Sequence, residues 1–177
     1  MRHEQGASFM ADIYGRLTGK AGGCLATLGP GAINLTLGIA DAQLDSSPVV
    51  ALAAQATLDR VFKESHQFVD LVRLFRPITK WGDMVVLPDT TPEILRKAFK
   101  QAQSERPGAT LVVVPQDVCV CVCVSHAETL ANPLPPEHPK PETPAPGQIA
   151  RAVQLINAAR YPSTGISRRW TNSIRWR

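Results

Sequence analysis

Residues 22–44 read GGCLATLGPGAINLTLGIADAQL and residues 48–54 read PVVALAA, so that two apolar runs flank a segment with helical spacing. The first run, residues 22–28, is bounded by glycines and is typical of a buried strand. A Gly-Pro-Gly turn at residues 29–31 ends it, and apolar side chains then recur at helical intervals over residues 32–44. Residues 48–54 are entirely apolar again. The order strand, helix, strand predicts a unit with two parallel strands.

The same alternation continues on both sides of this unit. The further expected elements are helices over residues 3–17, 65–75 and 91–104 and short apolar strands over residues 78–81 and 110–114. Apolar strands that alternate with helices predict an α/β fold, a mainly parallel sheet with helices on both faces.

The chain changes character after residue 118, and four segments are expected. They are an α/β domain (1–118), a Val-Cys repeat with a Pro-rich linker (119–147), the first helix of a truncated further domain (148–162) and an unrelated basic tail (163–177). Seven prolines in the linker exclude a sheet interior and indicate an extended chain.

The net charge of +4 comes from the end of the chain. Residues 160–177 contain five arginines and no acidic residue, and the preceding residues carry 14 basic and 15 acidic side chains. A basic tail with tryptophans can contact phosphates, but such tails are mostly solvated, so we expect no nucleic-acid partner. No apolar run approaches the roughly 20 residues that cross a bilayer, and no signal peptide is visible. We therefore expect a cytoplasmic protein without a membrane partner.

The four cysteines do not match a common metal-binding pattern. Cys24 lies in an apolar run and is expected to be a small buried residue. Cys119, Cys121 and Cys123 alternate with valines, whereas zinc ligands are usually separated by two to four residues. In a strand these three side chains would share one face, which leaves metal binding open. A translated GT repeat gives the same alternation, and we favour that origin and expect no metal ligand in this chain.

Several motifs over residues 2–118 occur in the order and spacing of one known domain. They are RHEQGA at 2–7, GRLTGK at 15–20, GPGAINL at 29–35, IADA at 39–42, Asp-Ser-Ser-Pro-Val-Val at 45–50, ITKW at 78–81, RPG at 106–108 and VPQDV at 114–118. Together they resemble the pyrimidine-binding domain of acetolactate synthases, which are thiamine-diphosphate enzymes. The family's domain begins with a further strand and helix, so the resemblance implies a fold that is incomplete at its N-terminus.

The resemblance implies chemistry at the ring of thiamine diphosphate. In the family a carboxylate hydrogen-bonds N1′ of the aminopyrimidine and favours the imino tautomer, which removes the proton at C2 of the thiazolium. The resulting carbanion decarboxylates pyruvate and passes a two-carbon unit to a second 2-oxo acid, in branched-chain amino acid biosynthesis. Glu4 matches this carboxylate, and we expect burial to raise its pKa so that it holds a proton near neutrality. An ordinary first-turn glutamate is the alternative.

Further site residues follow from the same motifs. Pro30, Gly31 and Asn34 match the aminopyrimidine side of the cofactor pocket. Gln67 matches a catalytic glutamine that reaches into the site from a neighbouring helix. His66 gives the pair His-Gln, which is similar to the catabolic, flavin-independent members, although a packing histidine is equally compatible.

Two basic residues complete the expected site. Lys80 and Arg106 match positions near the substrate channel and, in flavin-containing members, near FAD. Solvated surface charges are the alternative interpretation.

The family's diphosphate-binding motif, Gly-Asp-Gly followed by an asparagine, does not occur in this sequence. In the family this motif holds Mg2+ and the diphosphate on a domain of another subunit, within a homodimer or tetramer. We therefore expect a fragment that binds thiamine diphosphate weakly or not at all and is inactive alone. Pyruvate and the other 2-oxo acid would be substrates of the parent enzyme.

Three other interpretations remain open. Another thiamine-diphosphate carboligase or decarboxylase would share Glu4 and the Gly-Pro-Gly turn. A non-catalytic domain would dock onto full-length subunits through the same helices. A flavodoxin-like nucleotide binder is less favoured, because it would carry a G-x-G-x-x-G or P-loop motif and neither occurs here.

Overall fold

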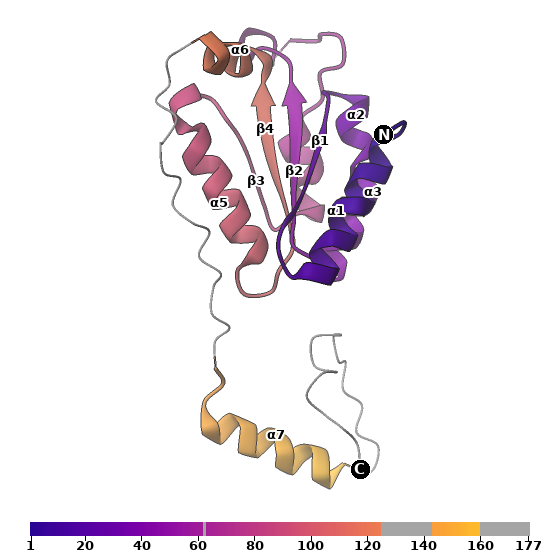
Figure 1. Ribbon diagram of the computed structural model, residues 1–177, viewed down its shortest axis with the longest axis vertical. Coiled ribbons are helices and arrows are strands. Elements are labelled where there is room, and N and C mark those ends of the chain that lie inside the picture. Colours follow the sequence, from indigo (N-terminus) through magenta and orange to yellow (C-terminus); the bar gives the residue numbers. More distant parts are fainter. Residues whose placement is uncertain (62, 125–142, 160–177) are drawn as a thin grey trace. The chain divides into compact units, whose positions relative to one another are not determined.

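The computed structural model describes residues 1–61, 63–124 and 143–159, and a four-stranded sheet lies at its centre (Figure 1). The strands are β1 (Gly22–Ala26), β2 (Val49–Gln55), β3 (Trp81–Met84) and β4 (Ala109–Pro115). They lie in the order β1-β2-β4-β3, and each neighbouring pair is parallel. The expected parallel sheet is confirmed.

Helices cover both faces of this sheet (Figure 1). One face carries α1 (Glu4–Thr18), α2 (Pro30–Asn34), α3 (Thr36–Leu44) and α4 (Leu71–Phe75), and the other carries α5 (Thr91–Gln103) and α6 (Gln116–Val124). Three short 3-10 turns join them: η1 (Leu58–Arg60), η2 (Arg76–Ile78) and η3 (Pro88–Thr90). The α/β class expected from the sequence is therefore confirmed.

Each face of the sheet has its own apolar core, because successive side chains of a strand point to opposite sides. The core under α1–α4 contains Cys24, Leu35, Ile39, Ala51, Leu71, Phe75, Leu111 and Val113, and the core under α5 contains Val50, Val85, Ala98, Ala102, Val112 and Val118. Burial raises the pKa of the Cys24 thiol to about 12. Cys24 is thus the inert buried side chain that its apolar surroundings predict.

An ionic network joins α1 to α3. The Arg16 guanidinium donates to Asp12 on its own helix at 2.8 Å and to Asp41 on α3 at 2.7 Å, and it also pairs with Asp45 just beyond α3. Asp12 is buried, so Arg16 neutralises a carboxylate that would otherwise lie uncompensated between helix and sheet. The network fixes how α1 lies against α3.

Two expected elements are wrong in their bounds. The helix expected over residues 65–75 begins only at Leu71, because the Asp70 side chain accepts a hydrogen bond from the Arg73 N–H and caps the helix there. Gln67 has a φ of 60°, which a helix does not allow. The strand expected over 78–81 begins at Trp81, since η2, which contains Pro77, occupies the preceding residues.

The segment expected to be one helix over residues 32–44 is two helices, α2 and α3, with Leu35 between them. The Val-Cys repeat is also helical as far as the structure describes it, because α6 runs from Gln116 to Val124. A strand in which Cys119, Cys121 and Cys123 share one face is therefore excluded.

The chain divides into two compact units, Met1–Lys140 and Pro141–Arg177. In the second unit α7 (Pro146–Ala158) confirms the helix expected near residue 148. The Pro-rich part of the linker lies largely outside the described residues, and the basic tail at 163–177 lies entirely outside them. No helix in the described ranges combines the length and the apolar character that a membrane crossing requires.

Candidate functional site

Glu4 is the first residue of α1, and the local sequence fixes it there. His3 caps the helix, because its Nδ1 accepts a hydrogen bond from the Gln5 N–H at 3.2 Å. The Glu4 side chain is half-buried, and its Oε2 accepts a hydrogen bond from the Asn34 side-chain amide at 3.0 Å. Asn34 is the last residue of α2. The two helices thus bring a carboxylate and an amide together across 30 residues of sequence.

The Gly-Pro-Gly turn lies at the carboxyl end of β1, beside this pair. Gly29 has a φ of 58°, a conformation that side chains disfavour, and Pro30 then starts α2. A Cβ on Gly31 would lie 2.6 Å from Thr27 Cγ2 and 3.3 Å from Glu4 Oε1. Gly31 therefore lets Thr27 and the Glu4 carboxylate approach the turn more closely than a side chain at this position would allow.

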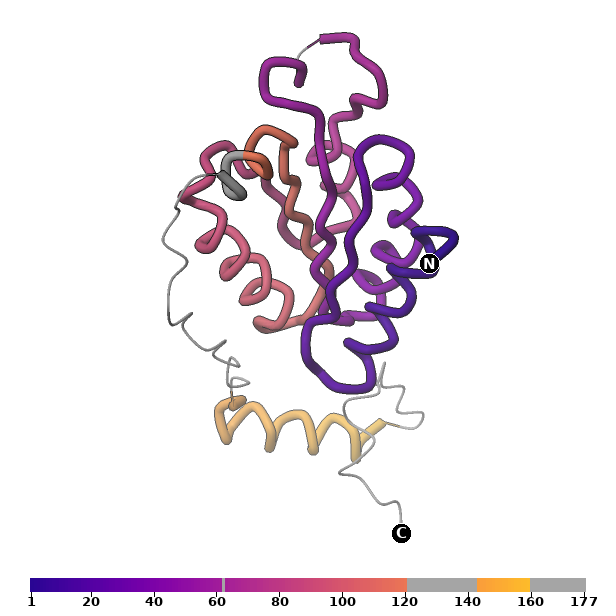
Figure 2. The backbone as a smooth tube through the Cα atoms, turned by 45° about the horizontal axis from the view of Figure 1, so that its top comes forward, coloured from indigo at the N-terminus to yellow at the C-terminus, as the bar shows by residue number. Residues whose placement is uncertain are grey.

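Gln67 approaches the same turn from the segment that follows β2, which projects beyond the carboxyl end of the sheet (Figure 2). A Cβ on Gly29 would lie 2.6 Å from the Gln67 carbonyl oxygen and 2.9 Å from Gln67 Cβ. The structure thus brings Glu4, Gly31, Asn34 and Gln67 to one edge of the sheet. His66 is exposed next to Gln67. Gln67 arrives on an irregular segment with a left-handed backbone, and the helix expected to carry it is absent there.

Comparisons with known proteins identify the family of the first part of the chain. Residues 1–74 match the family described as "Thiamine pyrophosphate enzyme, N-terminal TPP binding domain". The chain belongs to the thiamine pyrophosphate enzymes. Glu4, the Gly-Pro-Gly turn and Gln67 all lie within the matched residues.

The most similar relatives include acetolactate synthases from bacteria and plants. The chain is 43% identical over 165 residues to acetolactate synthase large subunit IlvB1 of Mycobacterium tuberculosis, 41% identical over 167 residues to the large subunit of Corynebacterium glutamicum, and 39% identical over 162 residues to the chloroplastic enzyme of Arabidopsis thaliana. These matches cover 92%, 92% and 91% of this chain but only 26%, 26% and 24% of the relatives. The chain therefore spans about a quarter of their length.

Lys80 lies away from the Glu4 edge of this thiamine pyrophosphate domain. It stands just before β3, at the amino-terminal edge of the sheet, and its Nζ donates to the carbonyls of Gln101, Ser104 and Arg106 at 3.0, 2.6 and 3.1 Å. Burial lowers the pKa of Lys80. A cation on the last carbonyls of α5 stabilises the helix end, so Lys80 has a structural role within this chain.

Arg106 lies at the same amino-terminal edge. It donates from Nε to the Ser46 hydroxyl at 2.7 Å and from Nη2 to the Leu44 carbonyl at 3.2 Å, at the end of α3. The structure therefore does not bring the two expected channel residues to Glu4. Both tie helix ends to neighbouring segments.

The pKa of Glu4 is lowered in this chain, and the expected increase is wrong for the chain as it stands. The backbone N–H of Glu4 and then the Asn34 amide donate to the carboxylate and favour its charged form. Desolvation acts in the opposite direction but is weaker, because the side chain is only half-buried. Raising the pKa requires a further surface over Glu4.

The residues at this edge fit the aminopyrimidine half of thiamine diphosphate. The backbone at Gly31 lies close to the Glu4 carboxylate, because no side chain stands between them. A carboxylate can accept from or, when protonated, donate to a ring nitrogen, and Asn34 fixes its orientation through the other oxygen. In the described ranges no group of three or more His, Cys, Asp or Glu side chains is arranged to hold a metal ion.

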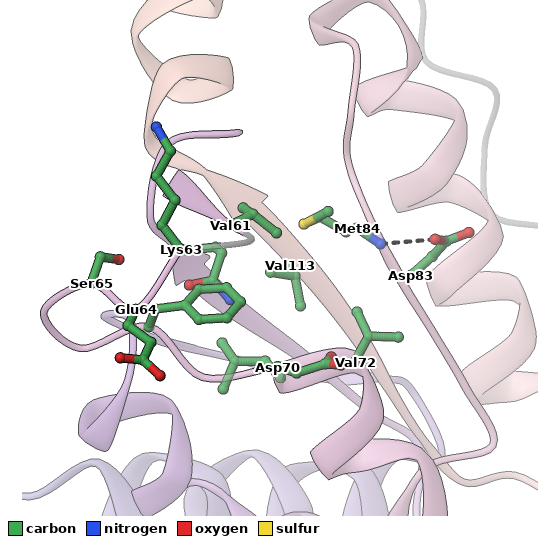
Figure 3. A pocket seen from close by; sticks show the side chains of 12 residues that line it. Val61, Lys63, Glu64, Ser65, Asp70, Val72, Asp83, Met84 and Val113 are labelled. Carbon is green, nitrogen blue, oxygen red and sulfur yellow. Dashed lines mark hydrogen bonds between the residues drawn. The ribbon is translucent and has the colours of Figure 1, made fainter. Parts of the chain in front are cut away.

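A separate cavity of about 800 Å3 lies at the carboxyl ends of β2, β3 and β4 (Figure 3). Its lining residues are Gln55, Val61, Lys63, Glu64, Ser65, Phe68, Asp70, Leu71, Val72, Asp83, Met84 and Val113. Sequence reasoning missed this cavity, although ligands of parallel α/β sheets commonly bind outside the carboxyl ends of the strands. The segment that carries Gln67 forms one wall of it, since Ser65 and Phe68 flank that residue.

Proposed function

We propose that this chain binds the aminopyrimidine ring of thiamine diphosphate for an acetolactate synthase, with Glu4 as the carboxylate that hydrogen-bonds the ring nitrogen. The observation that carries the proposal is the convergence of Glu4, Asn34 and Gly31 at the carboxyl end of β1. The identity to acetolactate synthases over most of the chain supports this enzyme rather than another carboligase.

Each residue has a defined part in this proposal. Asn34 holds the Glu4 carboxylate by donating to Oε2, which leaves Oε1 on the side of Gly31. Gly31 lets the backbone of the turn lie close to the Glu4 carboxylate, and Gln67 lies beside Gly29, from where it would contact the reacting groups. When bound beside Glu4, thiamine diphosphate would supply the nucleophilic carbon for the decarboxylation of pyruvate and the transfer of a two-carbon unit to a second 2-oxo acid. Glu4 holds or releases the proton at the ring nitrogen.

We place the Mg2+ and the diphosphate group on residues outside the described part of this chain, in a second subunit or a further domain. The charge-assisted contacts of a diphosphate are strong, and their loss leaves only ring stacking and one carboxylate contact. The isolated chain is therefore expected to bind the cofactor weakly, in the millimolar range. FAD has less support, since Lys80 and Arg106 lie at the opposite edge of the sheet.

Binding of thiamine diphosphate tests the site directly. Saturation-transfer NMR of the 177-residue chain should detect the cofactor at a Kd on the order of 1 mM, and Glu4→Ala should weaken binding about tenfold or more. Glu93→Ala is the matched control, because Glu93 also lies in the first turn of a helix, α5, on the other face of the sheet. Equal affinity in wild type and Glu4→Ala would contradict the proposal.

Turnover gives a second test. With pyruvate, Mg2+ and thiamine diphosphate, the purified chain should form no acetolactate, because the residues for the diphosphate are not supplied. Acetolactate formation by the chain alone would contradict the proposal that residues outside the described part of this chain hold the Mg2+ and the diphosphate.

A further inference from the structure

The first turn of α1 is capped by a histidine. His3 has an extended backbone, with φ −140° and ψ 130°, and its Nδ1 accepts a hydrogen bond from the Gln5 N–H at 3.2 Å. Its carbonyl accepts from the Gly6 N–H at 3.1 Å. The residues that usually cap helices are Ser, Thr, Asp and Asn, whose side-chain oxygen accepts such a bond. In this chain a ring nitrogen takes the place of that oxygen.

The turn that His3 caps is the one that carries Glu4, the first residue of α1. The Glu4 carboxylate accepts from its own backbone N–H and, through Oε2, from the Asn34 amide at 3.0 Å. The first donor belongs to the capped turn and the second to α2. The N–H groups at the start of a helix have no partner within the helix, so an uncapped first turn frays. The Glu4 carboxylate therefore meets both donors only while this turn is formed.

A cap made by an imidazole depends on pH, whereas a cap made by a hydroxyl or an amide does not. A neutral imidazole accepts at Nδ1 when its proton is on Nε2, but a ring with both nitrogens protonated can only donate. A positive charge at the N-terminus of a helix is also unfavourable. Histidine changes its charge between about pH 5 and 8. The His3 cap is therefore present near neutral pH and is lost in mildly acidic solution.

The charged groups around the capping imidazole are few. On its own segment the amino terminus and Arg2 disfavour the protonated ring, and Glu4 favours it. The elements that make the main contacts with α1 are α2, α3, β1 and β2. Their titratable residues are Cys24, which is buried, and Asp41, which pairs with Arg16 near the other end of α1. The balance at the cap is thus set by the first four residues of the chain.

We propose that His3 is a positioning residue for Glu4: its neutral imidazole caps α1 and so holds the Glu4 carboxylate against Asn34, and uptake of a proton by the ring releases the carboxylate. The inference rests on the proposed function, in which Glu4 contacts the ring nitrogen of the cofactor. Since the pKa of Glu4 is lowered, the carboxylate is still charged at the pH at which the cap is lost. The release is therefore a change of position and not of the charge of Glu4.

The side-chain amide protons of Asn34 report on this contact in NMR spectra of the full 177-residue chain. At about pH 7.5 their signals should coincide in wild type and His3→Asn, because asparagine is a strong cap without a charge, and should be displaced in His3→Ala. Hydrogen exchange of the Gln5 amide should be about fivefold faster in His3→Ala than in the other two. The Gln43 side-chain amide is the internal reference, because Gln43 accepts from the Ala109 N–H at the opposite edge of the sheet.

Lowering the pH from about 7.5 to about 5.5 gives a second test that does not depend on the folding of a variant. In wild type the Asn34 signals should move toward their positions in His3→Ala, and in His3→Asn they should stay, although both chains retain His66.

Three results would overturn the proposal. They are wild-type Asn34 signals in folded His3→Ala, displaced Asn34 signals in folded His3→Asn, and wild-type Asn34 signals that do not respond to the change in pH. Circular dichroism verifies the folding of each variant. None of these measurements contains thiamine diphosphate, so a failure of cofactor binding would count against the proposed function and leave the result for His3 unchanged.

Discussion

Glu4 is charged more readily in this chain than a free glutamate, because its own backbone N–H and the Asn34 amide both donate to the carboxylate. The same contacts orient the carboxylate beside Gly31. A lowered pKa means that the stabilisation from these contacts is present above the ordinary pKa of glutamate and is lost as the pH falls through the lowered value.

Removing the amide should reverse part of this shift. In Asn34→Ala the pKa of Glu4 should rise toward the ordinary glutamate value, since one donor to the charged form is lost. A pH titration of the 13C-labelled carboxyl groups by NMR measures it. Thr36→Ala is the control, because the Thr36 hydroxyl donates to the Ile33 carbonyl and not to Glu4. An unchanged Glu4 titration in Asn34→Ala would contradict the hydrogen bond.

The motifs predicted which residues gather at the site better than they predicted how each one is held. Glu4, Gly31 and Asn34 come together as expected because α1 and the turn after β1 are local, well-capped structures. The structural role of Lys80 could not be predicted from sequence. Its three carbonyl partners lie 21 to 26 residues away, and they come together around the Lys80 ammonium group only because α5 ends beside it.

At the scale of elements, β1 depends on a close approach to α1. A Cβ on Gly22 would lie 2.1 Å from the Ala11 carbonyl oxygen, and this backbone atom cannot move without shifting the helix. A Cβ on the next residue, Gly23, would meet no atom within 4 Å. Substitutions at these two neighbouring glycines therefore compare a position in close contact with α1 and a position with free space around it.

Gly22→Ala should lower the free energy of unfolding by about 2 kcal/mol or more, because it forces α1 away from the strand. Gly23→Ala should leave it within about 0.5 kcal/mol. Chemical denaturation of both variants measures the difference. Equal stabilities would show that the contact between Gly22 and α1 is not as close as described.

Helical periodicity predicted α1 and α5 well and failed at residues 65–70. The apolar spacing of Phe68, Leu71, Val72 and Phe75 is real, but it spans two structures, a segment that packs through Phe68 and a short helix that starts after Asp70. The left-handed backbone at Gln67 accompanies its contact with Gly29, which is 38 residues away in sequence. No local pattern reports such a contact.

At the scale of the whole molecule, both apolar clusters that the described residues form lie in the first unit. Every residue of the two clusters lies at or before Val118, and all four strands lie before α6. The first unit, Met1–Lys140, should therefore fold without the second.

A chain that ends at Lys140 should keep the thermal midpoint of the full chain within about 3 °C, because none of the core residues in the described part of the chain is removed. Thermal unfolding followed by circular dichroism measures both midpoints. A decrease of about 10 °C or more would show that residues after Lys140 stabilise the sheet.

The overall fold class was predictable from sequence, because four apolar runs alternate with helical segments and form the four parallel strands of the sheet. The outward apolar side chains of α3 were predicted only as part of one helical stripe. Their exposure became visible once the sheet was known to cover the opposite side of the helix.

The central claim is that Glu4 contacts the aminopyrimidine ring of thiamine diphosphate, and NMR of the Glu4 side-chain carboxyl carbon tests it most directly. On addition of millimolar thiamine diphosphate, the Glu4 resonance, assigned by its loss in Glu4→Gln, should shift with the fraction bound while the Glu93 resonance stays in place. A Glu4 resonance that does not respond, or one that shifts no more than that of Glu93, would contradict the account.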